Sequence, residues 1–263
     1  MRSLSIGATG MLAQQLNIET ISNNISNMST TGFKRQRAEF QDLLYQSQRR
    51  VGSTTSDAGT VVPVGIQIGA GVKPTAVYRI NEQGSLSTTN NSLDIAVNGQ
   101  GYFQITIPGS NTQTAYTRAG SFQLDSQGQI VTADGYVVLP GLTIPANTTA
   151  ITVSSTGVVQ ATVDGQVTAV TVGQFQMANF TNPAGLDAIG DNLLLQTTAS
   201  GQPTTGTPGS TGFGKLVQGS LEESNVNIVT EITNLISAQR AYEMNSRVIQ
   251  AADDLLTTLA QMK

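Results

Sequence analysis

Histidine and cysteine are both absent from the 263 residues of this chain. Without cysteine the chain has no disulfide and no thiolate metal site. Without histidine it has no Ser-His-Asp or Cys-His arrangement, none of the commonest zinc ligands and no general base that titrates near pH 7. Lysine, serine and carboxylate chemistry remain, but no S-x-x-K motif occurs. We therefore expect a chain with no catalytic residues, no metal and no cofactor.

Charge is also scarce, because charged residues make up 11% of the chain and the net charge is −4. Nucleic-acid-binding proteins usually carry a basic face, so no nucleic-acid partner is expected. No apolar run approaches the length of a membrane span, so no direct membrane insertion is expected. The first twenty residues lack a continuous apolar core, and we expect no secretory signal there. Export would then need a route that does not use such a signal.

The C-terminal residues predict a long helix with a narrow apolar seam. No Gly or Pro occurs from Leu221 to Lys263, and Asn225 or Asn227 is placed to cap the start. A helix of roughly 35 residues would be about 50 Å long. Its apolar residues recur every seven positions, with one more three positions after the last: Ile228, Leu235, Tyr242, Ile249, Leu256 and Leu259.

The N-terminal residues predict a second, weaker seam. Gly7 and Gln14 interrupt it, and Gly7 and Gly10 each cost a helix about 1 kcal/mol relative to Ala. Gly32 is a candidate for the helix stop. The seam consists of Leu4, Met11, Ile18 and Ile25 at spacings of seven, with Ile21 and Met28 three positions after the last two.

The two seams have two interpretations. In one, the helices pack on each other or on the rest of one monomer. In the other, which we favour, they form a subunit interface, because the seams are narrow and the N-terminal helix is too weak to stand alone.

The middle of the chain predicts a mainly antiparallel β domain. Turn pairs occur at Asn98-Gly99, Asp134-Gly135 and Asp164-Gly165, and residues 199–214 are expected to form a flexible return loop. The expected strands lie at residues 94–97, 102–107, 129–132, 136–139, 151–153, 158–163, 167–172 and 174–180.

The predicted fold class is therefore α+β, with long N- and C-terminal helices pairing as a coiled-coil core domain and with a mainly antiparallel β central domain. The core domain comprises residues 1–33 and 226–263. A joining region comprises residues 34–72 and 213–225, with an extended segment at 46–65, and the outer β domain covers residues 73–212.

Five of the thirteen basic residues lie together in the expected joining region. One interpretation is a solvated turn and helix face. The other is a set of joining-region contacts with acidic surface on a neighbouring subunit. These residues are Lys34, Arg35, Arg37, Arg49 and Arg50.

Other motifs carry no chemistry. Residues 98–102 contain a G-x-G, but a strand and not a helix is expected to follow, so a turn is favoured over a phosphate loop. The adjacent pairs Glu222-Glu223 and Asp253-Asp254 would point about 100° apart on a helix, which is unsuited to an acid/base dyad. We assign both pairs to solvated faces.

Three segments resemble the signatures of the flagellar basal-body rod and hook family. Residues 23–35 (NNISNMSTTGFKR) resemble its N-terminal motif, and residues 90–103 (NNSLDIAVNGQGYF) resemble its central motif. Residues 223–227 (ESNVN) and 239–246 (QRAYEMNS) resemble its C-terminal signature. The order and span match the family, and the length and the 46–65 segment are most similar to its distal-rod subunits.

The resemblance implies a structural subunit of the flagellar distal rod in the periplasm. Such a subunit would self-assemble into a straight helical tube that transmits motor torque to the hook. The partners implied are further copies of the chain, proximal-rod and hook subunits, surrounding ring proteins and the type III export apparatus.

Alternatives remain at this stage. Within the family they are a hook or a proximal-rod subunit. Outside it they are a secreted β-rich binding module with a coiled-coil stalk, and a polysaccharide-acting enzyme that uses Asp residues of the β domain.

Overall fold

The computed structural model describes residues 2–51, 64–108, 113–166 and 168–262. They form two compact units. The first, the helical unit, comprises residues 1–26, 36–78 and 227–263, and the second, the β unit, comprises residues 27–35 and 79–226. No helix in the described ranges combines the length and the apolar character needed to cross a membrane.

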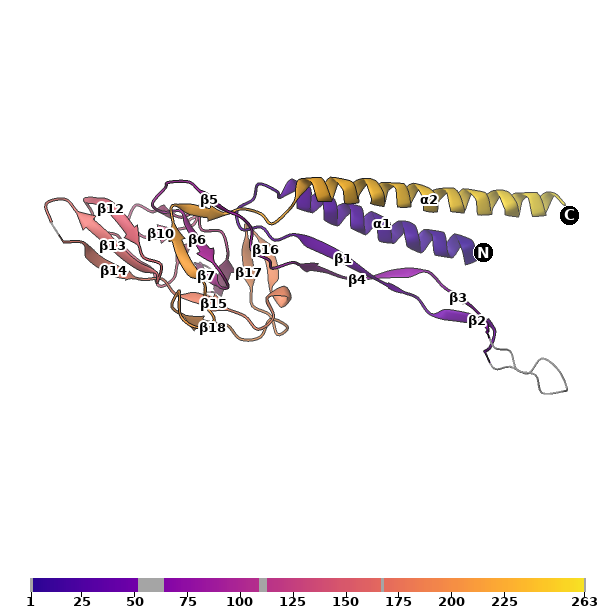
Figure 1. Cartoon of the computed structure of the whole chain (residues 1–263), viewed down its shortest axis with the longest axis horizontal. Coiled ribbons are helices and arrows are strands. Elements are labelled where there is room, and N and C mark those ends of the chain that lie inside the picture. Colours follow the sequence, from indigo (N-terminus) through magenta and orange to yellow (C-terminus); the bar gives the residue numbers. More distant parts are fainter. Residues whose placement is uncertain (1, 52–63, 109–112, 167, 263) are drawn as a thin grey trace. The chain divides into compact units, whose positions relative to one another are not determined.

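Two helices, α1 (Arg2–Ser26) and α2 (Ile228–Gln261), lie side by side in the helical unit (Figure 1). Asn227 caps α2 by accepting hydrogen bonds from the backbone N–H groups of Val229 and Thr230, as expected of an Asn at this position. The 34 residues of α2 agree with the length that the uninterrupted seam predicts.

The helices run antiparallel. Gly7 and Gly10, near the start of α1, face Ile249 and Asn245 in the second half of α2. At the other end of α1, Asn24 is hydrogen-bonded to the first turn of α2.

The prediction that Gly32 stops the first helix is wrong. The helix ends at Ser26, and Gly32 lies in the β unit with a φ of +69°. A Cβ atom there would lie 2.9 Å from the backbone nitrogen of Ala119, so glycine is needed for close approach of two backbone segments.

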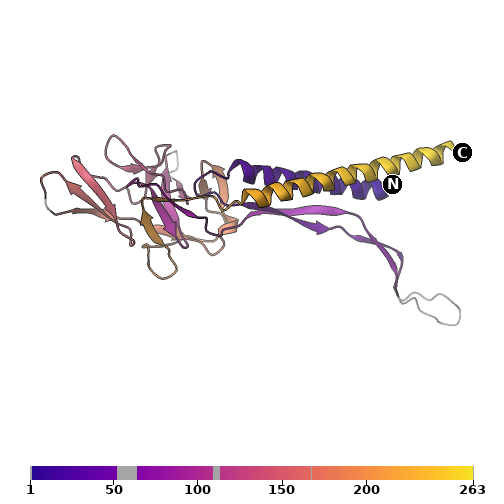
Figure 2. The same ribbon diagram turned by 45° about the horizontal axis from the view of Figure 1, so that its top comes forward.

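Four strands accompany the helices, and sequence patterning did not predict them. β1 pairs with β4, and β2 pairs antiparallel with β3 (Figure 2). Their bounds are β1 (Gln36–Asp42), β2 (Tyr45–Arg49), β3 (Ile66–Gly69) and β4 (Val72–Arg79), of which Arg79 belongs to the β unit. The expected 46–65 segment thus includes β2, while its residues 52–63 lie outside the described residues.

The β unit is built on antiparallel pairings, as predicted. Its largest sheet has the order β16-β17-β8-β7-β11-β10-β9, with β15 pairing with β7 and with β18. A second sheet has the order β12-β13-β14, and two further pairs are β19-β6 and β20-β5.

The strands of the β unit are β5 (Leu86–Thr88), β6 (Ile95–Asn98), β7 (Tyr102–Ile107), β8 (Gln113–Thr117), β9 (Gln123–Leu124), β10 (Ile130–Val131), β11 (Val137–Val138), β12 (Thr148–Val153), β13 (Val158–Val163), β14 (Val170–Gln174), β15 (Met177–Asn179), β16 (Asp187–Gly190), β17 (Leu193–Leu195), β18 (Thr204–Gly206), β19 (Lys215–Gln218) and β20 (Ser220–Glu222). A 3₁₀ turn, η1 (Pro183–Gly185), precedes β16.

Each expected strand has a counterpart, but the turns differ. Asp134-Gly135 joins the paired strands β10 and β11, and Asp164-Gly165 joins β13 and β14. Asn98-Gly99 does not close a hairpin, because β6 pairs with β19 and β7 pairs with β8. Residues 199–214, expected to be a loop, contain β18.

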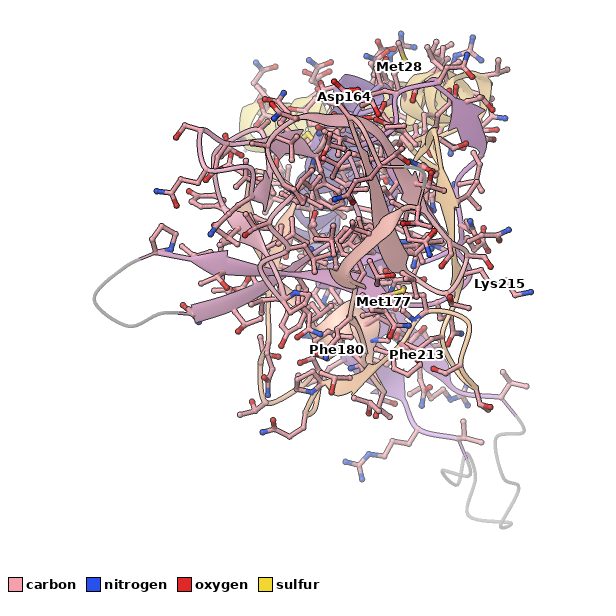
Figure 3. All side chains as sticks on the ribbon, turned by 90° about the vertical axis from the view of Figure 1, so that its left-hand side faces the viewer. Met28, Asp164, Met177, Phe180, Phe213 and Lys215 are labelled. Carbon is pink, nitrogen blue, oxygen red and sulfur yellow. The ribbon has the colours of Figure 1, made fainter. Side chains whose placement is uncertain are left out.

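The main core of the β unit is aromatic. Phe103 lies edge-on to Phe122 at a centroid distance of 5.0 Å and to Phe175 at 6.2 Å. Met177 belongs to the same buried cluster, whereas Lys215 extends outward from the unit (Figure 3). This core supports the strands whose ends carry the polar residues described next.

Candidate functional site

A buried carboxylate lies at the centre of a polar network in the β unit. The Glu222 side chain has no exposed surface and forms ion pairs with two cations, Lys34 and Arg118. The Lys34 Nζ atom is 2.6 Å from Oε1, and the Arg118 Nε atom is 2.7 Å from Oε2. The backbone N–H of Gly84 also donates to Oε1 at 3.0 Å. Three fixed donors, Lys34, Arg118 and the Gly84 backbone, therefore satisfy the Glu222 carboxylate.

Arg118 extends the network to the central signature. Its guanidinium donates to the carbonyl oxygen of Gly101 at 2.7 Å, to that of Val97 at 3.3 Å and to that of Gly99. Gly99 and Gly101 have φ values of +111° and +131°, which favour glycine. The glycines of the expected turn thus present carbonyl groups to a buried arginine.

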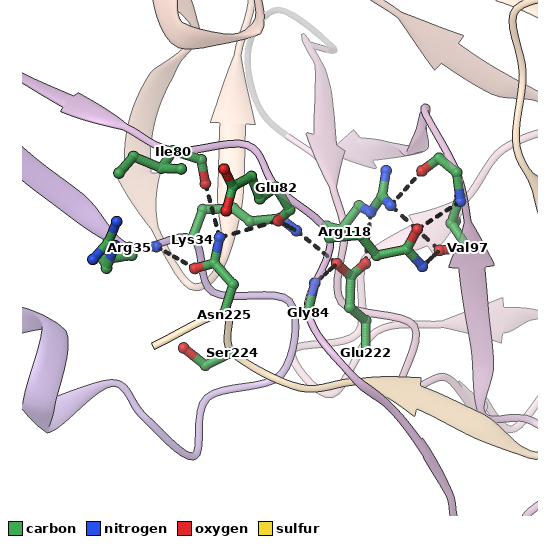
Figure 4. A network of polar contacts seen from close by, with 12 residues as sticks. Lys34, Arg35, Ile80, Glu82, Gly84, Val97, Arg118, Glu222, Ser224 and Asn225 are labelled. Carbon is green, nitrogen blue, oxygen red and sulfur yellow. Dashed lines mark hydrogen bonds and ion pairs between the residues drawn. The ribbon is translucent and has the colours of Figure 1, made fainter. Parts of the chain in front are cut away.

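Asn225 joins the remaining segments (Figure 4). Its side-chain oxygen accepts from the Arg35 backbone N–H at 2.7 Å, and its amide nitrogen donates to Ile80 O at 2.9 Å and to Glu82 O at 3.0 Å. Lys34 donates to the same Glu82 carbonyl at 2.7 Å. The network therefore connects residues near 34, 82, 100, 118 and 222 within one unit.

Electrostatics favours the charged form of Glu222. Burial alone raises the pKa of this carboxyl, but the charge of Arg118 and the hydrogen bonds from Lys34 and Arg118 outweigh it and hold the pKa below its ordinary value. Burial is also the main influence on Lys34 and lowers the pKa of its ammonium group, against the attraction of Glu222. A buried network with its charges paired holds chain segments in place and offers no unpaired acid or base.

The assignment of Glu222 to a solvated face is therefore wrong, whereas Glu223 is exposed. Adjacent carboxylates on β20 and just after it point to opposite sides, so one enters the interior and the other meets water. The one sequence feature that marks Glu222 is its position directly before the C-terminal signature at residues 223–227.

A second buried polar cluster lies in the helical unit. Asn24 of α1 donates to Glu231 Oε2 of α2 at 3.2 Å. It also donates to the carbonyl oxygen of Gln36 at 2.8 Å and accepts from the Gln36 N–H at 2.8 Å. Asn24 is 1% exposed and Glu231 is 3% exposed. One amide thus connects α1, α2 and β1.

The predicted interface residues occupy three kinds of position. Ile21 is buried, and half-buried positions hold Leu4, Met11, Ile18, Ile25, Leu235 and Ile249. Exposed positions hold Met28, Ile228, Tyr242 and Leu256. The side chain of Leu259 lies outside the described residues.

Small residues that sequence patterning treated as weak points lie where the helices come closest. A Cβ atom at Gly7 would be 2.8 Å from Ile249 Cγ1, and one at Gly10 would be 2.8 Å from the Asn245 amide nitrogen. Ala13 and Ala238 are buried as well. Gly7 and Gly10 thus allow close approach at the same time as they lower helix propensity.

The five basic residues of the expected joining region are not equivalent. Lys34 is buried in the network around Glu222, and Arg35 is half-buried, with its backbone bonded to Asn225. Arg37, Arg49 and Arg50 are exposed. Residues 36–42 and 45–49 are strands, so the interpretation as a helix face is wrong.

Within the described ranges, no group of three or more Asp and Glu residues is arranged to hold a metal ion. The two polar clusters are therefore the candidate sites, and both hold segments of the chain together.

Three family models match the chain, and each matched segment overlaps one of the sequence signatures. Residues 4–34 match "Flagella basal body rod protein", and residues 96–161 match "Flagellar hook protein FlgE/F/G D1 domain". Residues 217–262 match "Flagellar basal body rod FlgEFG protein C-terminal". The network around Glu222 contains residues of all three matched segments, among them Lys34, Gly99 and Glu222.

Similar proteins align along the whole chain. The flagellar basal-body rod protein FlgG of Caulobacter vibrioides is 58% identical over all of both chains. The FlgG of Borreliella burgdorferi is 46% identical, over 100% of this chain and 99% of that protein. The flagellar hook-basal body complex protein FlhP of Bacillus subtilis is 31% identical, over 97% of each chain. The chain therefore belongs to the FlgG family of flagellar basal-body rod proteins, as a structural subunit of the distal rod and not an enzyme.

Proposed function

We propose that this chain polymerises into a straight helical tube and that its terminal helices form the coiled-coil core domain of that tube. The observation that carries the proposal is the apolar surface left exposed on the helical unit. Val229 is 71% exposed, Leu255 67% and Leu12 65%. Apolar side chains gathered along a helix indicate a surface that another molecule covers.

The strands of the helical unit add to this surface. Leu44, between β1 and β2, is 87% exposed, and Tyr45 and Ile66 are also exposed. Two-stranded ribbons leave backbone hydrogen-bonding groups free at their edges, which neighbouring chains can cover. We propose that residues 34–72 and 213–225 form the joining region between the core and an outer domain at residues 73–212, and that Arg37 and Arg49 meet acidic surface on adjacent subunits.

Pairing of the helices completes on assembly in this proposal. The glycines of α1 reduce its stability in isolation, and helices of this kind are stable mainly through packing. A subunit with unpaired ends also suits export through the type III apparatus, because that route carries unfolded chains. A head-to-tail contact whose rotation does not close then generates an open filament.

Torque transmission needs chain segments that are held firmly where they leave the β unit. The chain passes from one unit to the other four times, after Ser26, Arg35, Tyr78 and Val226. Three of these crossings are within two residues of Arg35, Ile80 or Asn225, which the hydrogen bonds of Asn225 connect. We propose that this anchoring lets the tube carry motor torque to the hook, with proximal-rod subunits, hook subunits and ring proteins as its further partners.

Negative-stain images of the concentrated full-length protein test the proposal. Open-ended straight tubes are the expected result. Discrete trimers would indicate a binding module with a coiled-coil stalk, and a protein that stays monomeric at every concentration would contradict polymerisation.

A further inference from the structure

The polar cluster of the helical unit raises a question of register. Asn24 and Glu231 are almost fully buried at the contact between α1 and α2, where the apolar and small side chains of Ala13, Ile21 and Ala238 are buried as well. Buried polar groups stabilise little compared with apolar residues of similar size. Their value lies in the alternatives that they exclude, as for a buried Asn in a coiled coil.

The apolar seams leave the register open. Apolar residues recur every seven positions in both helices, at Leu4, Met11 and Ile18 in α1 and at Leu235, Tyr242 and Ile249 in α2. Sliding one helix along the other by seven residues therefore brings the same kinds of apolar residue together again. Contacts along the seam do not distinguish these registers strongly.

Asn24 does distinguish them. In the observed register its amide faces the carboxylate of Glu231. A slip of seven residues in one direction places Asn24 opposite Ala238, which has no hydrogen-bonding side chain. A slip in the other direction places it beyond Ile228, the first residue of α2. In both cases the Asn24 amide and the Glu231 carboxylate lose their hydrogen bond to each other, which raises the free energy of the slipped arrangement.

Asn24 also fixes where the chain goes next. Its amide bonds both the N–H and the C=O of Gln36, the first residue of β1, in the manner of a neighbouring strand. A register error of α1 would therefore have to break the start of β1 as well. Arrangements in which α1 moves therefore lose two hydrogen bonds to Gln36 in addition to the one to Glu231.

We infer that Asn24 and Glu231 are specificity-determining residues for assembly, which select the register in which the two terminal helices pair. The inference concerns the helix pair of the proposed core domain and so rests on the proposed function. One Asn of the N-terminal signature and one Glu of the C-terminal helix would thus stabilise one register over other registers whose apolar contacts are of similar strength.

Engineered disulfides can read the register, because the chain contains no cysteine of its own. The pair G10C/N245C reports the observed register, since a Cβ at Gly10 would lie 3.1 Å from Asn245 Cγ. The pairs G10C/A252C and G10C/A238C report the two seven-residue slips. Seven helical residues span about 10 Å, beyond the ~7 Å Cα separation that a disulfide tolerates.

Each cysteine pair is introduced into the full-length chain with the native residues, with N24L/E231L or with E231Q. Intrachain disulfides are counted by mass spectrometry after mild oxidation, separately in monomer and polymer fractions. We expect the native background to form the G10C/N245C disulfide almost alone. In N24L/E231L its excess over the slipped disulfides should fall by roughly fivefold or more. E231Q should retain the native pattern, because its amide oxygen still accepts from Asn24.

Two results would overturn the inference. One is an unchanged preference for G10C/N245C in N24L/E231L. The other is loss of all three disulfides in that variant, because the polar pair would then hold the helices together without choosing their register. Failure of the parent chain to form tubes contradicts the proposed function instead, and the disulfide ratio in the monomer fraction is still measured.

Discussion

Glu222 Oε1 lies 2.6 Å from Lys34 Nζ, although the two residues are 188 positions apart in the chain. The contact joins the segment after the first helix to the segment before the last one, and both lie in the β unit. With Arg118 on the other carboxylate oxygen, Glu222 balances two buried cations.

The substitution E222Q should destabilise the β unit. It keeps the shape of the side chain but leaves Lys34 and Arg118 buried without a counter-ion, and breaking such a pair costs about 3 kcal/mol or more. Urea unfolding of the full-length monomer, followed by near-ultraviolet circular dichroism, measures the loss. E223Q is the matched control and should change the free energy of unfolding by less than about 0.5 kcal/mol, because Glu223 is exposed. Equal effects of the two substitutions would mean that the ion pairs contribute nothing.

Lowering the pH should remove the stabilisation that the ion pairs of Glu222 provide. The folded-state pKa of Glu222 is below the ordinary carboxyl value, so the unfolded chain takes up this proton first as the pH falls. The stabilisation is complete above the unfolded pKa of about 4.3 and is lost as the pH falls through the lower folded value. The difference in free energy of unfolding between the parent and E222Q should therefore be constant from pH 7 to about 5 and then shrink. A difference that grows on acidification would contradict this assignment.

Substitution of Gly32 should destabilise the β unit for two reasons, its positive φ and the backbone that lies close to it. A matched substitution at Gly135 separates the two effects. G32A places a Cβ atom at a φ of +69° and 2.9 Å from the backbone of both Arg118 and Ala119. G135A meets a comparable φ, +84°, but nothing lies within 4 Å of its Cβ. G135A should cost about 1 kcal/mol of stability, and G32A at least twice as much. Thermal unfolding of both variants measures the difference, and equal melting temperatures would show that the backbone approach at Gly32 is not tight.

The two helices and eight of the twenty strands in the described ranges were predictable because their signals are local. The seven-residue spacing and the cap at Asn227 fixed α2, and the turn pairs at Asp134-Gly135 and Asp164-Gly165 fixed two hairpins. These features depend on residues close in sequence. The strands β2 to β4 were missed because their side chains are largely exposed and lack the alternation of a half-buried strand. β1 alternates between half-buried and exposed positions, but only Ala38 and Phe40 among its seven residues are apolar.

The two polar clusters were not predictable from local pattern. A single Glu beside Ser and Asn is typical of solvated surface, and only the fold brings Lys34 and Arg118 to Glu222. The same holds for Asn24 in the last turn of α1, which bonds Glu231 at a distance of 207 positions in the chain. The signatures marked both regions, but their physical role depends on contacts between segments far apart in the chain.

Protease should cut the two ends of the monomer before it cuts the middle of the chain. If the helices pair fully only on assembly, the ends of the monomer will be cut first and a core near residues 73–213 will remain. Limited digestion of monomer and polymer at equal protein concentration, analysed by mass spectrometry, compares the two states. Protection of the termini in the polymer alone is expected, and a monomer with intact termini would show that pairing precedes assembly.

An acidic residue in the seam of α2 should block polymerisation. L235D and Y242D each place a carboxylate among apolar side chains that are half-buried or partly exposed in the monomer and are covered in the proposed polymer. The β unit contains neither residue and should keep its near-ultraviolet circular dichroism. Q250D adds the same charge at an exposed position outside the seven-residue repeat and is the control. Sedimentation should recover tubes from the parent and from Q250D but only monomers from L235D and Y242D. Normal tubes from both seam variants would place the subunit contacts elsewhere on the helical unit, with the exposed ribbon residues Leu44 and Tyr45 as the next positions to change.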